Sequence, residues 1–350
     1  MPTIFDLINA RNIATYYEEN GSNRIPYLGE TLFPARKQLG LDLSWIKGFN
    51  GLPVSLKPSE FDAKATLRDR IGLTKVDTEM PFFREAMRVG EKERQELLRL
   101  MDSTNSQYLM PVINRIYDDA TNLVNGARVV SERMIMQLLS TGKISIVANR
   151  INYDYNYELP AEHTETLTGT DQWSDPNSNP IDDIRTWQDK VENDTGVRPA
   201  RAICTRKTWN YLLANNVIRL DMNPAGGQNI ILTDSMLQQY LAAKLGISVA
   251  VYNKKFATEV GGAAQLFFPD DMFTLIPDGN LGNLYYGTTP EEADLMSGAT
   301  SAEVQIVNTG VAVTTIKEPH PVNVETIVSQ ICMPSFEAID SVFIAKVAGN

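Results

Sequence analysis

Residues 111–141 read PVINRIYDDATNLVNGARVVSERMIMQLLST, and their apolar side chains recur at spacings of three and four. This spacing is typical of one face of an α-helix, which has about 3.6 residues per turn. Pro111 suits a first helical position and Gly142 suits a left-handed helix end. We therefore predict one continuous helix of about eight turns, roughly 45 Å long, which we call the spine. Its apolar positions are Val112, Ile113, Ile116, Ala120, Leu123, Val124, Ala127, Val130, Met134, Ile135 and Leu138.

The segment ahead of the spine begins with residues 1–43, whose apolar residues are interrupted by Gly and Pro. A short amphipathic helix is expected between Ile4 and Ile13, followed by an extended arm. Tyr27 and Phe33 lie in a pattern that cannot form a core of its own. A disordered terminus is one interpretation. We favour an N-terminal arm that becomes ordered on a neighbouring subunit, with both aromatic residues in the interface.

Residues 44–80 contain short runs of alternating apolar residues separated by Gly and Pro, which predicts a long hairpin-like loop. A two-stranded ribbon is marginally stable in water, so we expect another subunit to cover it. The expected interface residues in this extended loop are Trp45, Phe49, Leu52, Val54 and Phe61. Its lysines are either partners in a covalent cross-link to a neighbour or charges that prevent aggregation. We favour the second interpretation, because no catalytic carboxylate accompanies them.

The rest of the chain divides into a split platform and an inserted lobe. Residues 81–101 are expected to be helical, and together with the spine and the strands that follow it they form a first domain over 81–160. Residues 161–317 alternate helical and strand patterns, which predicts a separate α/β lobe. Within it, Lys254–Ala264 suggests a hairpin tip. Residues 318–350 turn to strand patterns again and are expected to return to the first domain, so the fold class is α+β.

The composition is that of an ordinary globular protein of about two domains, with 350 residues, 43% of them hydrophobic. The net charge of −11 is uneven, at +2 for residues 1–150 (20 basic, 18 acidic) and −13 for 151–350 (12 basic, 25 acidic). An acidic second half argues against binding to a nucleic-acid backbone, which needs clustered Lys and Arg. No apolar run is long enough to span a membrane and no signal peptide is visible. Two cysteines make no disulfide framework, so a reducing cytoplasm is the default.

The sequence offers no convincing catalytic or metal site. His163 and His320 lack neighbouring ligands at metal-binding spacing, and no phosphate-binding glycine loop or serine-hydrolase motif occurs. Three pairs of adjacent carboxylates are explained better as caps and turns; they are Asp182/Asp183, Asp270/Asp271 and Glu291/Glu292. Cys204 and Cys332 lie in apolar runs and are expected to be inert core thiols. We therefore predict no enzyme activity, no cofactor and no metal.

Several stretches, in their order and spacing, resemble the lambda-type major head protein family of tailed bacteriophages. They are Trp173 with Asp175-Pro176 and Ile181-Asp182-Asp183-Ile184, Leu245-Gly246-Ile247 with Val251-Tyr252, Phe268-Pro269-Asp270-Asp271, Tyr286-Gly287, and Met333-Pro334-Ser335. The resemblance covers most of the chain and implies the major capsid fold of these phages. In that fold an N-terminal arm, an extended loop, a peripheral domain with the spine and an inserted axial domain follow one another.

The resemblance also implies a function. Copies of such a protein form hexamers and pentamers, which close into the icosahedral shell around the packaged genome. The arm and the extended loop would hold neighbouring subunits, and Lys254 and Lys255 would lie in an interface at the axial loop. Separate scaffolding and portal proteins and a decoration protein are the expected partners, without membrane or sequence-specific nucleic-acid binding. The subunit would belong to the virion and assemble in the cytoplasm of the bacterial host.

Three alternatives remain open at this point. An encapsulin-like microbial compartment would use the same fold to enclose an enzyme instead of a genome. A two-domain enzyme would need a site in a cleft between lobe and platform, and the missing motifs count against it. A tail-tube or baseplate protein would form filaments or rings instead of closed shells.

Overall fold

The computed structural model describes residues 8–19, 26–47, 74–93, 95, 99, 109–148, 151–226, 230–298, 302–320 and 322–349. The chain forms two compact units, each built from three separate stretches. Unit 1 comprises Met1–Leu43, Asp77–Arg133 and Asn283–Ser335. Unit 2 comprises Ser44–Val76, Met134–Gly282 and Phe336–Asn350. No described helix is both long and apolar enough to cross a membrane.

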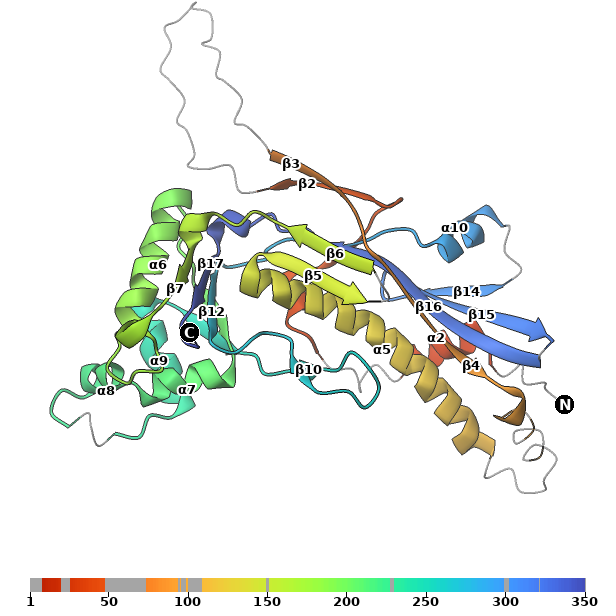
Figure 1. Cartoon of the computed structure of the whole chain (residues 1–350), viewed down its shortest axis with the longest axis horizontal. Helices are drawn as coiled ribbons and strands as arrows, with labels where there is room; N and C mark the ends of the chain where they lie inside the picture. Colours follow the sequence, from red (N-terminus) through yellow and green to blue (C-terminus); the bar gives the residue numbers. More distant parts are fainter. Residues whose placement is uncertain are drawn as a thin grey trace, which may run out of the picture. The chain divides into compact units, whose positions relative to one another are not determined.

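The spine is present as α5, a single helix of 33 residues over Leu109–Thr141 (Figure 1). It ends where predicted, because Gly142 has a left-handed φ of 69° and its N–H donates to Leu138 O. It begins two residues before Pro111, which is tolerated in the first turn, where N–H groups have no partner within the helix. The residues up to Arg133 belong to unit 1 and those from Met134 to unit 2.

Unit 1 is built on a six-stranded sheet in which β1, β13, β16, β15 and β14 follow one another, and β4 also pairs with β16. Its strands are β1 (Ala35–Lys37), β4 (Phe82–Val89), β13 (Leu284–Tyr286), β14 (Glu303–Val307), β15 (Val311–Pro319) and β16 (Val322–Pro334). Its helices, besides the first part of α5, are α2 (Ala10–Glu19), α3 (Gly29–Leu32) and α10 (Pro290–Ser297).

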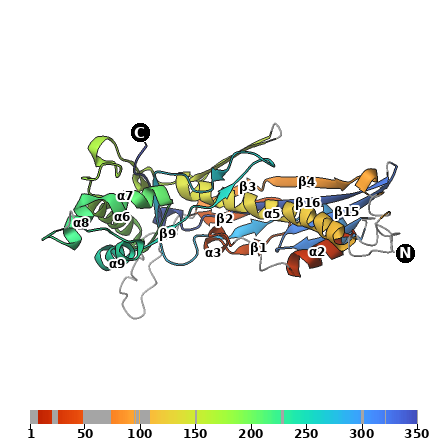
Figure 2. The ribbon, with the colours of Figure 1, turned by 90° about the horizontal axis from the view of Figure 1, so that it is seen from below.

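The helices of unit 1 contact opposite faces of this sheet. The Ala10 N–H donates to Thr315 Oγ1, and the Gln330 amide donates to Ala127 O, so α2 and α5 lie on one face (Figure 2). Ser329 Oγ donates to the Glu291 carboxylate of α10 at 2.8 Å. Because neighbouring side chains of a strand point to opposite faces, Ser329 places α10 on the other face.

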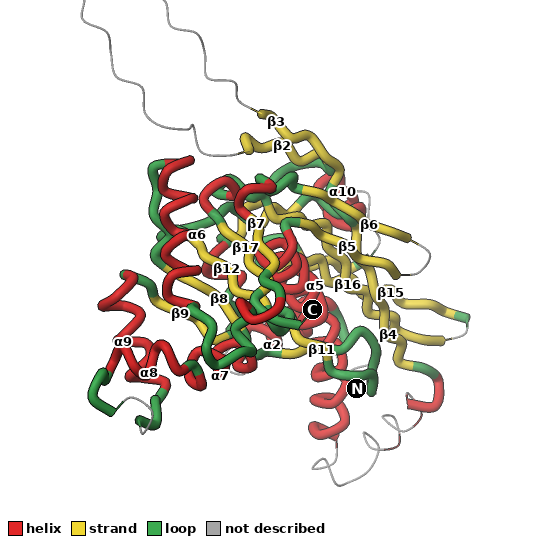
Figure 3. The backbone as a smooth tube through the Cα atoms, turned by 60° about the vertical axis from the view of Figure 1, so that its left-hand side comes forward, coloured by secondary structure: helices red, strands yellow, loops and turns green. Residues whose placement is uncertain are grey.

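Unit 2 is built on a mixed five-stranded sheet in the order β7, β17, β12, β8, β9, shown in yellow in Figure 3. These strands are β7 (Thr164–Thr166), β8 (Arg201–Cys204), β9 (Ser248–Val251), β12 (Met272–Ile276) and β17 (Phe343–Lys346). The helices are α6 (Pro180–Thr195), α7 (Arg206–Ala214), α8 (Asn216–Met222) and α9 (Asp234–Leu245). Three short 3-10 helices are η3 (Ala161–His163), η4 (Gly169–Asp171) and η6 (Ile339–Ser341).

The core of unit 2 lies between its helices and one face of this sheet. Trp187 of α6 and Trp209 of α7 pack with Phe273 and Phe343, which point to the same face of the sheet. Thr274 points to the other face and donates to Leu139 O of α5 at 2.8 Å. The last turns of α5 therefore cover the second face, and Leu138 is fully buried there.

Three small two-stranded sheets complete the described structure. They are β2 (Asp42–Lys47) with β3 (Thr74–Glu79), β5 (Lys143–Ala148) with β6 (Ile151–Asn156), and β10 (Lys255–Phe256) with β11 (Gln265–Leu266). The last two confirm the strands expected after Gly142 and the hairpin predicted over 254–264. The pair β2 and β3 joins the two ends of residues 48–73, which lie outside the described residues.

For the chain after residue 80, two sequence expectations are wrong in part, although the described residues 91–93, 95 and 99 are helical as predicted. Residues 82–89 form β4 instead of a helix, because β16 offers eight consecutive pairing positions from Val324 to Ile331 and such pairing overrides a weak local pattern. The boundary expected at residue 317 also differs from the division into units. Residues 283–335 belong to unit 1, whereas 336–350 return to unit 2, where β17 pairs with β12 and β7.

Candidate assembly surface

In the described residues 8–19 and 26–33, the apolar side chains of the N-terminal segment are covered by its own chain, which corrects the expectation that it lacks a core. Tyr27 and Phe33 are buried within unit 1, as are Ile13 and Tyr17 of α2. Of the helix expected between Ile4 and Ile13, the part before Ile8 lies outside the described residues, and the described helix is α2 at Ala10–Glu19. Tyr27 and Phe33 are therefore core residues of the folded subunit and present little surface to a neighbour.

Two side chains of α5 hold this segment in place. The Gly29 N–H donates to both carboxylate oxygens of the buried Glu132, at 3.0 and 3.3 Å. One turn earlier, Arg128 pairs with Glu30 at 2.8 Å, and its guanidinium lies over the Tyr27 ring at 5.1 Å. Burial, together with Glu132 and Glu30, raises the pKa of Tyr27, while Arg128 acts in the opposite direction. These contacts of Glu132 and Arg128 fix residues 27–30 to the spine of the same subunit.

The base of the predicted extended loop is anchored by an aromatic pair in unit 2. Trp45 of β2 is buried and stacks on Tyr157, with ring centroids 5.5 Å apart. Trp45 is therefore not an exposed interface residue in the described structure. The other expected interface residues of the loop, namely Phe49, Leu52, Val54 and Phe61, lie outside the described residues. Their role as subunit contacts stays a prediction.

The hairpin of β10 and β11 presents an exposed tip. Phe256 and Phe267 contact each other across its base at 4.8 Å, and Lys254 lies over the Tyr252 ring at 6.0 Å. Val260 at the tip is fully exposed. The side chain of Lys255 is exposed as well. These features suit a contact loop, although the assignment of Lys254 and Lys255 to an interface stays a prediction.

The hairpin of β5 and β6 exposes an apolar side chain on each of its two faces. Ile144 and Ile146 of β5 are buried, opposite the half-buried Tyr155 and Tyr153. Near the turn, Val147 is 71% exposed and Ile151 is 50% exposed. In the sequence, Tyr153 and Tyr155 alternate with polar residues, which predicts ordinary packing on one face of a strand and gives no reason to expect exposed apolar residues beside them.

The carboxylates at the start of α6 have structural partners. Asn179 caps the helix by accepting from the Asp182 N–H, and Asp182 pairs with Arg185 at 2.9 Å. Asp183 accepts a hydrogen bond from the Trp173 indole at 2.9 Å. Both observations agree with the structural role that the sequence predicted for this pair.

The other two carboxylate pairs are bound to hydroxyl and basic groups within their own units. Asp270 accepts from Thr205 at 2.6 Å, and Asp271 accepts from Lys207 and Tyr211 at 2.7 and 2.9 Å. In unit 1, Glu291 pairs with Arg84 at 2.6 Å, and Glu292 pairs with Lys37. These contacts connect separate elements of each unit.

The remaining chemically reactive side chains are buried or dispersed. Burial raises the pKa of Cys204 to about 12 and that of Cys332 to about 12, so neither is a thiolate at neutral pH. His163 is buried, with Nε2 at 3.0 Å from Asp194. Among the described residues, no three His, Cys, Asp or Glu side chains are grouped to hold a metal ion.

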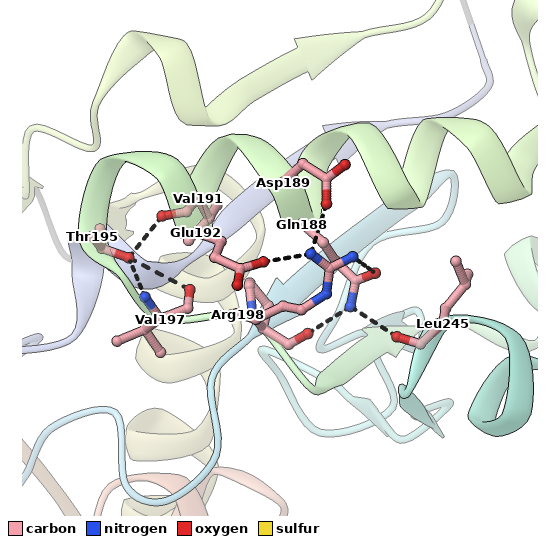
Figure 4. A network of polar contacts seen from close by, with 9 residues as sticks. Gln188, Asp189, Val191, Glu192, Thr195, Val197, Arg198 and Leu245 are labelled. Carbon is pink, nitrogen blue, oxygen red and sulfur yellow. Dashed lines mark hydrogen bonds and ion pairs between the residues drawn. The ribbon is translucent and has the colours of Figure 1, made fainter.

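A buried glutamine that was not predicted as a polar junction joins three segments of unit 2 (Figure 4). The Gln188 amide of α6 donates to Pro199 O at 2.7 Å and to Leu245 O at the end of α9 at 3.2 Å. Its Oε1 accepts from Arg198, which also pairs with Asp189 at 2.6 Å. A polar residue in the apolar stripe of α6 was the sequence signal for this junction.

Asp183 makes the stability of unit 2 depend on pH. Burial raises the pKa of Asp183 to about 6, and the nearby acidic residues Glu165, Asp171 and Asp182 add to the shift, against the effect of the Trp173 hydrogen bond. Because the folded-state pKa is raised, this group favours folding when protonated, and that contribution is lost as pH rises from about 4 to about 6.

We therefore expect Asp183→Asn to be more stable than wild type by about 1–2 kcal/mol at pH 7.5, a figure reduced for the partial exposure of the side chain. Thermal melting from pH 4 to pH 7.5 measures this, and the difference should vanish at the acidic end. The exposed neighbour Asp182→Asn is the control and should keep the wild-type decline between pH 4 and pH 6. A constant difference between Asp183→Asn and wild type across this range would contradict the assignment.

The comparisons with known proteins concern almost the whole chain. The family model described as phage major capsid protein E matches residues 10–347. No curated protein matches the chain. Among solved structures, a prophage protein of E. coli CFT073, solved as a candidate capsid protein, is 15% identical with a TM-score of 0.60. The alignment covers 97% of this chain and 99% of that one.

Two further solved structures show the same fold. A phage-related protein from Bordetella bronchiseptica RB50 is 14% identical, with a TM-score of 0.58 and coverage of 97% of this chain and 98% of that one. The capsid of cyanophage A-1(L) is 13% identical, with a TM-score of 0.50 and coverage of 92% of both chains. These likenesses confirm the predicted α+β capsid fold, and the family match confirms the resemblance stated from the sequence. The chain belongs to the phage major capsid protein E family.

Proposed function

We propose that copies of this chain form hexamers and pentamers that close into the icosahedral shell of a tailed-phage head. The observation that carries the proposal is the match of residues 10–347 to a major capsid family. Membership of that family makes the chain a structural component of the virion. It also favours a genome shell over the microbial compartment, and a structural protein over the two-domain enzyme.

The domain roles follow the same proposal. Unit 1, with its six-stranded sheet and the first part of α5, corresponds to the peripheral domain. The five-stranded sheet of unit 2 and its helices correspond to the axial domain, with residues 254–264 as the axial loop. Residues 44–80 correspond to the extended loop, whose base is the pair β2 and β3.

The finer claims about partners also belong to this proposal. Head-to-tail contacts in a ring need two different complementary surfaces on one subunit. A phage shell further needs a portal, and separate scaffolding and decoration proteins are proposed as partners here. Assembly is proposed to occur in the host cytoplasm, without catalytic turnover, cofactor or metal.

Removing residues 48–73 tests the role of the extended loop. A short glycine–serine linker would join β2 to β3, which preserves the Trp45–Tyr157 stack at the loop base. We expect a soluble subunit that melts like wild type but forms no closed shells, because the neighbour-binding segment is gone. Circular dichroism measures folding, and negative-stain electron microscopy measures assembly.

A glycine–serine segment of the same length as residues 48–73 is the control for chain length. It should also fail to assemble, since the proposed contacts are made by side chains of the natural segment. Normal shells from either variant would show that this loop is not required between subunits.

A further inference from the structure

We propose that β6 pairs with β6 of a second copy, antiparallel and across a two-fold axis, so that two hairpins form one four-stranded sheet. This inference rests on the proposed self-assembly and adds a specific contact to it. In the arrangement, Tyr153 of one copy lies directly opposite Tyr153 of the other. Strand addition of this kind is a common mode of protein recognition.

The first observation is that the free edge of β5 is closed by its own chain. The Gln137 side chain of α5 donates to Ser145 O at 3.0 Å and accepts from the Ser145 N–H at 3.2 Å. Thr141 Oγ1 likewise donates to Lys143 O at 3.1 Å and accepts from the Lys143 N–H at 3.3 Å. These side chains take the place of a neighbouring strand, so a partner strand has no access to this part of β5.

The second observation is that β6 presents an open edge. Within the described chain, β6 pairs only with β5. Because the Ser145 backbone groups point away from β6, Ser145 and Asp154 form a non-hydrogen-bonded pair in the ladder. The N–H and C=O groups of Asn152, Asp154 and Asn156 therefore point outward on the far side of β6. All three residues are exposed.

The side chains of β6 select one register for a second copy. With Tyr153 opposite Tyr153, the outward-pointing Asn152 meets Asp154 of the second copy, and the two backbones can exchange both hydrogen bonds. The Asn152 amide can also donate to the Asp154 carboxylate across the strands, twice by symmetry. On the other face, Tyr155 covers Ile151 of the second copy, which is 50% exposed in the single subunit.

The neighbouring symmetric registers are less favourable. Centring the pair on Asp154 would place two Asp154 carboxylates opposite each other, and like charges in facing positions are destabilising. Centring it on Asn152 would leave Tyr155 beyond the end of the other β6. The chosen register also extends the existing stack of Tyr153 and Tyr155, whose rings are 6.2 Å apart and inclined by 14°.

The hairpin also has a physical need for such a partner. A sheet of two strands is only marginally stable in water. A four-stranded sheet with a covered apolar face is more stable. A second copy of the chain fits this edge because β6 is complementary to itself. The strand supplies both the Asn152 amide and the Asp154 carboxylate that accepts from it. It also supplies both the exposed Ile151 and the Tyr155 ring that covers it. An isologous contact of this kind places each complementary pair twice about the axis.

A cysteine at the centre of the contact tests the proposal. In Tyr153→Cys, the two thiols would lie in a non-hydrogen-bonded pair with Cα atoms about 4.5 Å apart, which suits a disulfide. Cys204 and Cys332 are fully buried and should not react. After mild oxidation of assembled particles, a non-reducing gel should show reducible dimers.

Tyr155→Cys is the matched control on the same face of the same strand. Its symmetry mates would lie about 13 Å apart, at 3.3 Å per residue, which is too far for a disulfide. We expect at least about tenfold more dimer from Tyr153→Cys than from this control. Dimers from Tyr155→Cys in place of Tyr153→Cys would overturn the register.

A second pair of variants covers the case in which Tyr153→Cys does not fold. Shells that contain both Ile151→Cys and Tyr155→Cys subunits should give dimers, and shells of either variant alone should not. If the cysteine variants form normal shells but give no cross-links in either experiment, the strand pairing alone is overturned. Failure of the wild-type chain to form any shell would instead contradict the proposed function.

Discussion

Replacing Leu138 with aspartate is expected to prevent unit 2 from folding. Leu138 is fully buried in the part of α5 that belongs to unit 2, where Thr274 Oγ1 donates to the neighbouring Leu139 O. Burying an unpaired carboxylate costs several kcal/mol, and losing the packed leucine costs about 2–5 kcal/mol more. The sum is comparable with the entire stability of a typical domain, about 5–15 kcal/mol. Expression in the soluble fraction and the loss of a cooperative melting transition are the measurements.

Ile116→Asp is the control on the same helix and the same predicted apolar stripe. From the apolar spacing alone, the two positions are equivalent. Ile116, however, is only half-buried, so the carboxylate of an aspartate at this position can keep part of its hydration. We expect Ile116→Asp to fold with a lower melting temperature. Equal behaviour of the two variants would show that burial along α5 is not as described.

Replacing Gly310 with alanine is expected to destabilise unit 1 by about 3 kcal/mol, near the upper end for an overpacked site. A Cβ at Gly310 would lie 2.4 Å from the Cβ of Tyr286 and 2.7 Å from its Cγ. Tyr286 lies in β13 and is buried, so its ring cannot move aside without disturbing the sheet. Thermal melting should show a midpoint lowered by roughly 5–10 °C.

Gly126→Ala is the matched control for Gly310→Ala. Gly126 lies inside α5, and a Cβ there would meet no atom within 4 Å. Alanine in a helix interior is favoured over glycine by about 1 kcal/mol, so this variant should melt slightly higher than wild type. A Gly310→Ala variant that melts at or above the wild-type temperature would contradict the packing around Tyr286.

The helices could be predicted because their signals are local. The spine, α6 and α9 each combine apolar residues at helical spacing with local signals at their ends. Asn179 and Thr233 accept from N–H groups at the starts of α6 and α9, and Gly196 and Gly246 end them with left-handed φ angles of 75° and 67°. None of these features depends on distant parts of the chain.

Features that depend on distant segments could not be predicted. Residues 82–89 have no strong strand pattern, and only their pairing with β16, more than 230 residues later, makes them a strand. The covering of the N-terminal segment likewise depends on Arg128 and Glu132 of α5. A pattern within residues 1–43 cannot show that a helix about 100 residues away buries Tyr27 and Phe33.

The family assignment holds although one of the reasons that first suggested it is wrong. The sequence interpretation held that the first eighty residues lack cover within the subunit, whereas residues 26–33 are held by the spine of their own unit. The expectation of cover by a neighbouring subunit now applies to residues 48–73, which lie outside the described residues. The order of elements and the family match are independent of this point, so the capsid assignment does not depend on it.

Sedimentation velocity of the purified chain, with negative-stain electron microscopy of the same sample, tests the central claim most directly. The account predicts particles many times heavier than the 39.0 kDa subunit, seen as closed shells of uniform size. If scaffolding is required, co-expression with the scaffolding protein should produce the same shells. A chain that stays monomeric, or forms only open filaments, with and without such a partner would contradict the account.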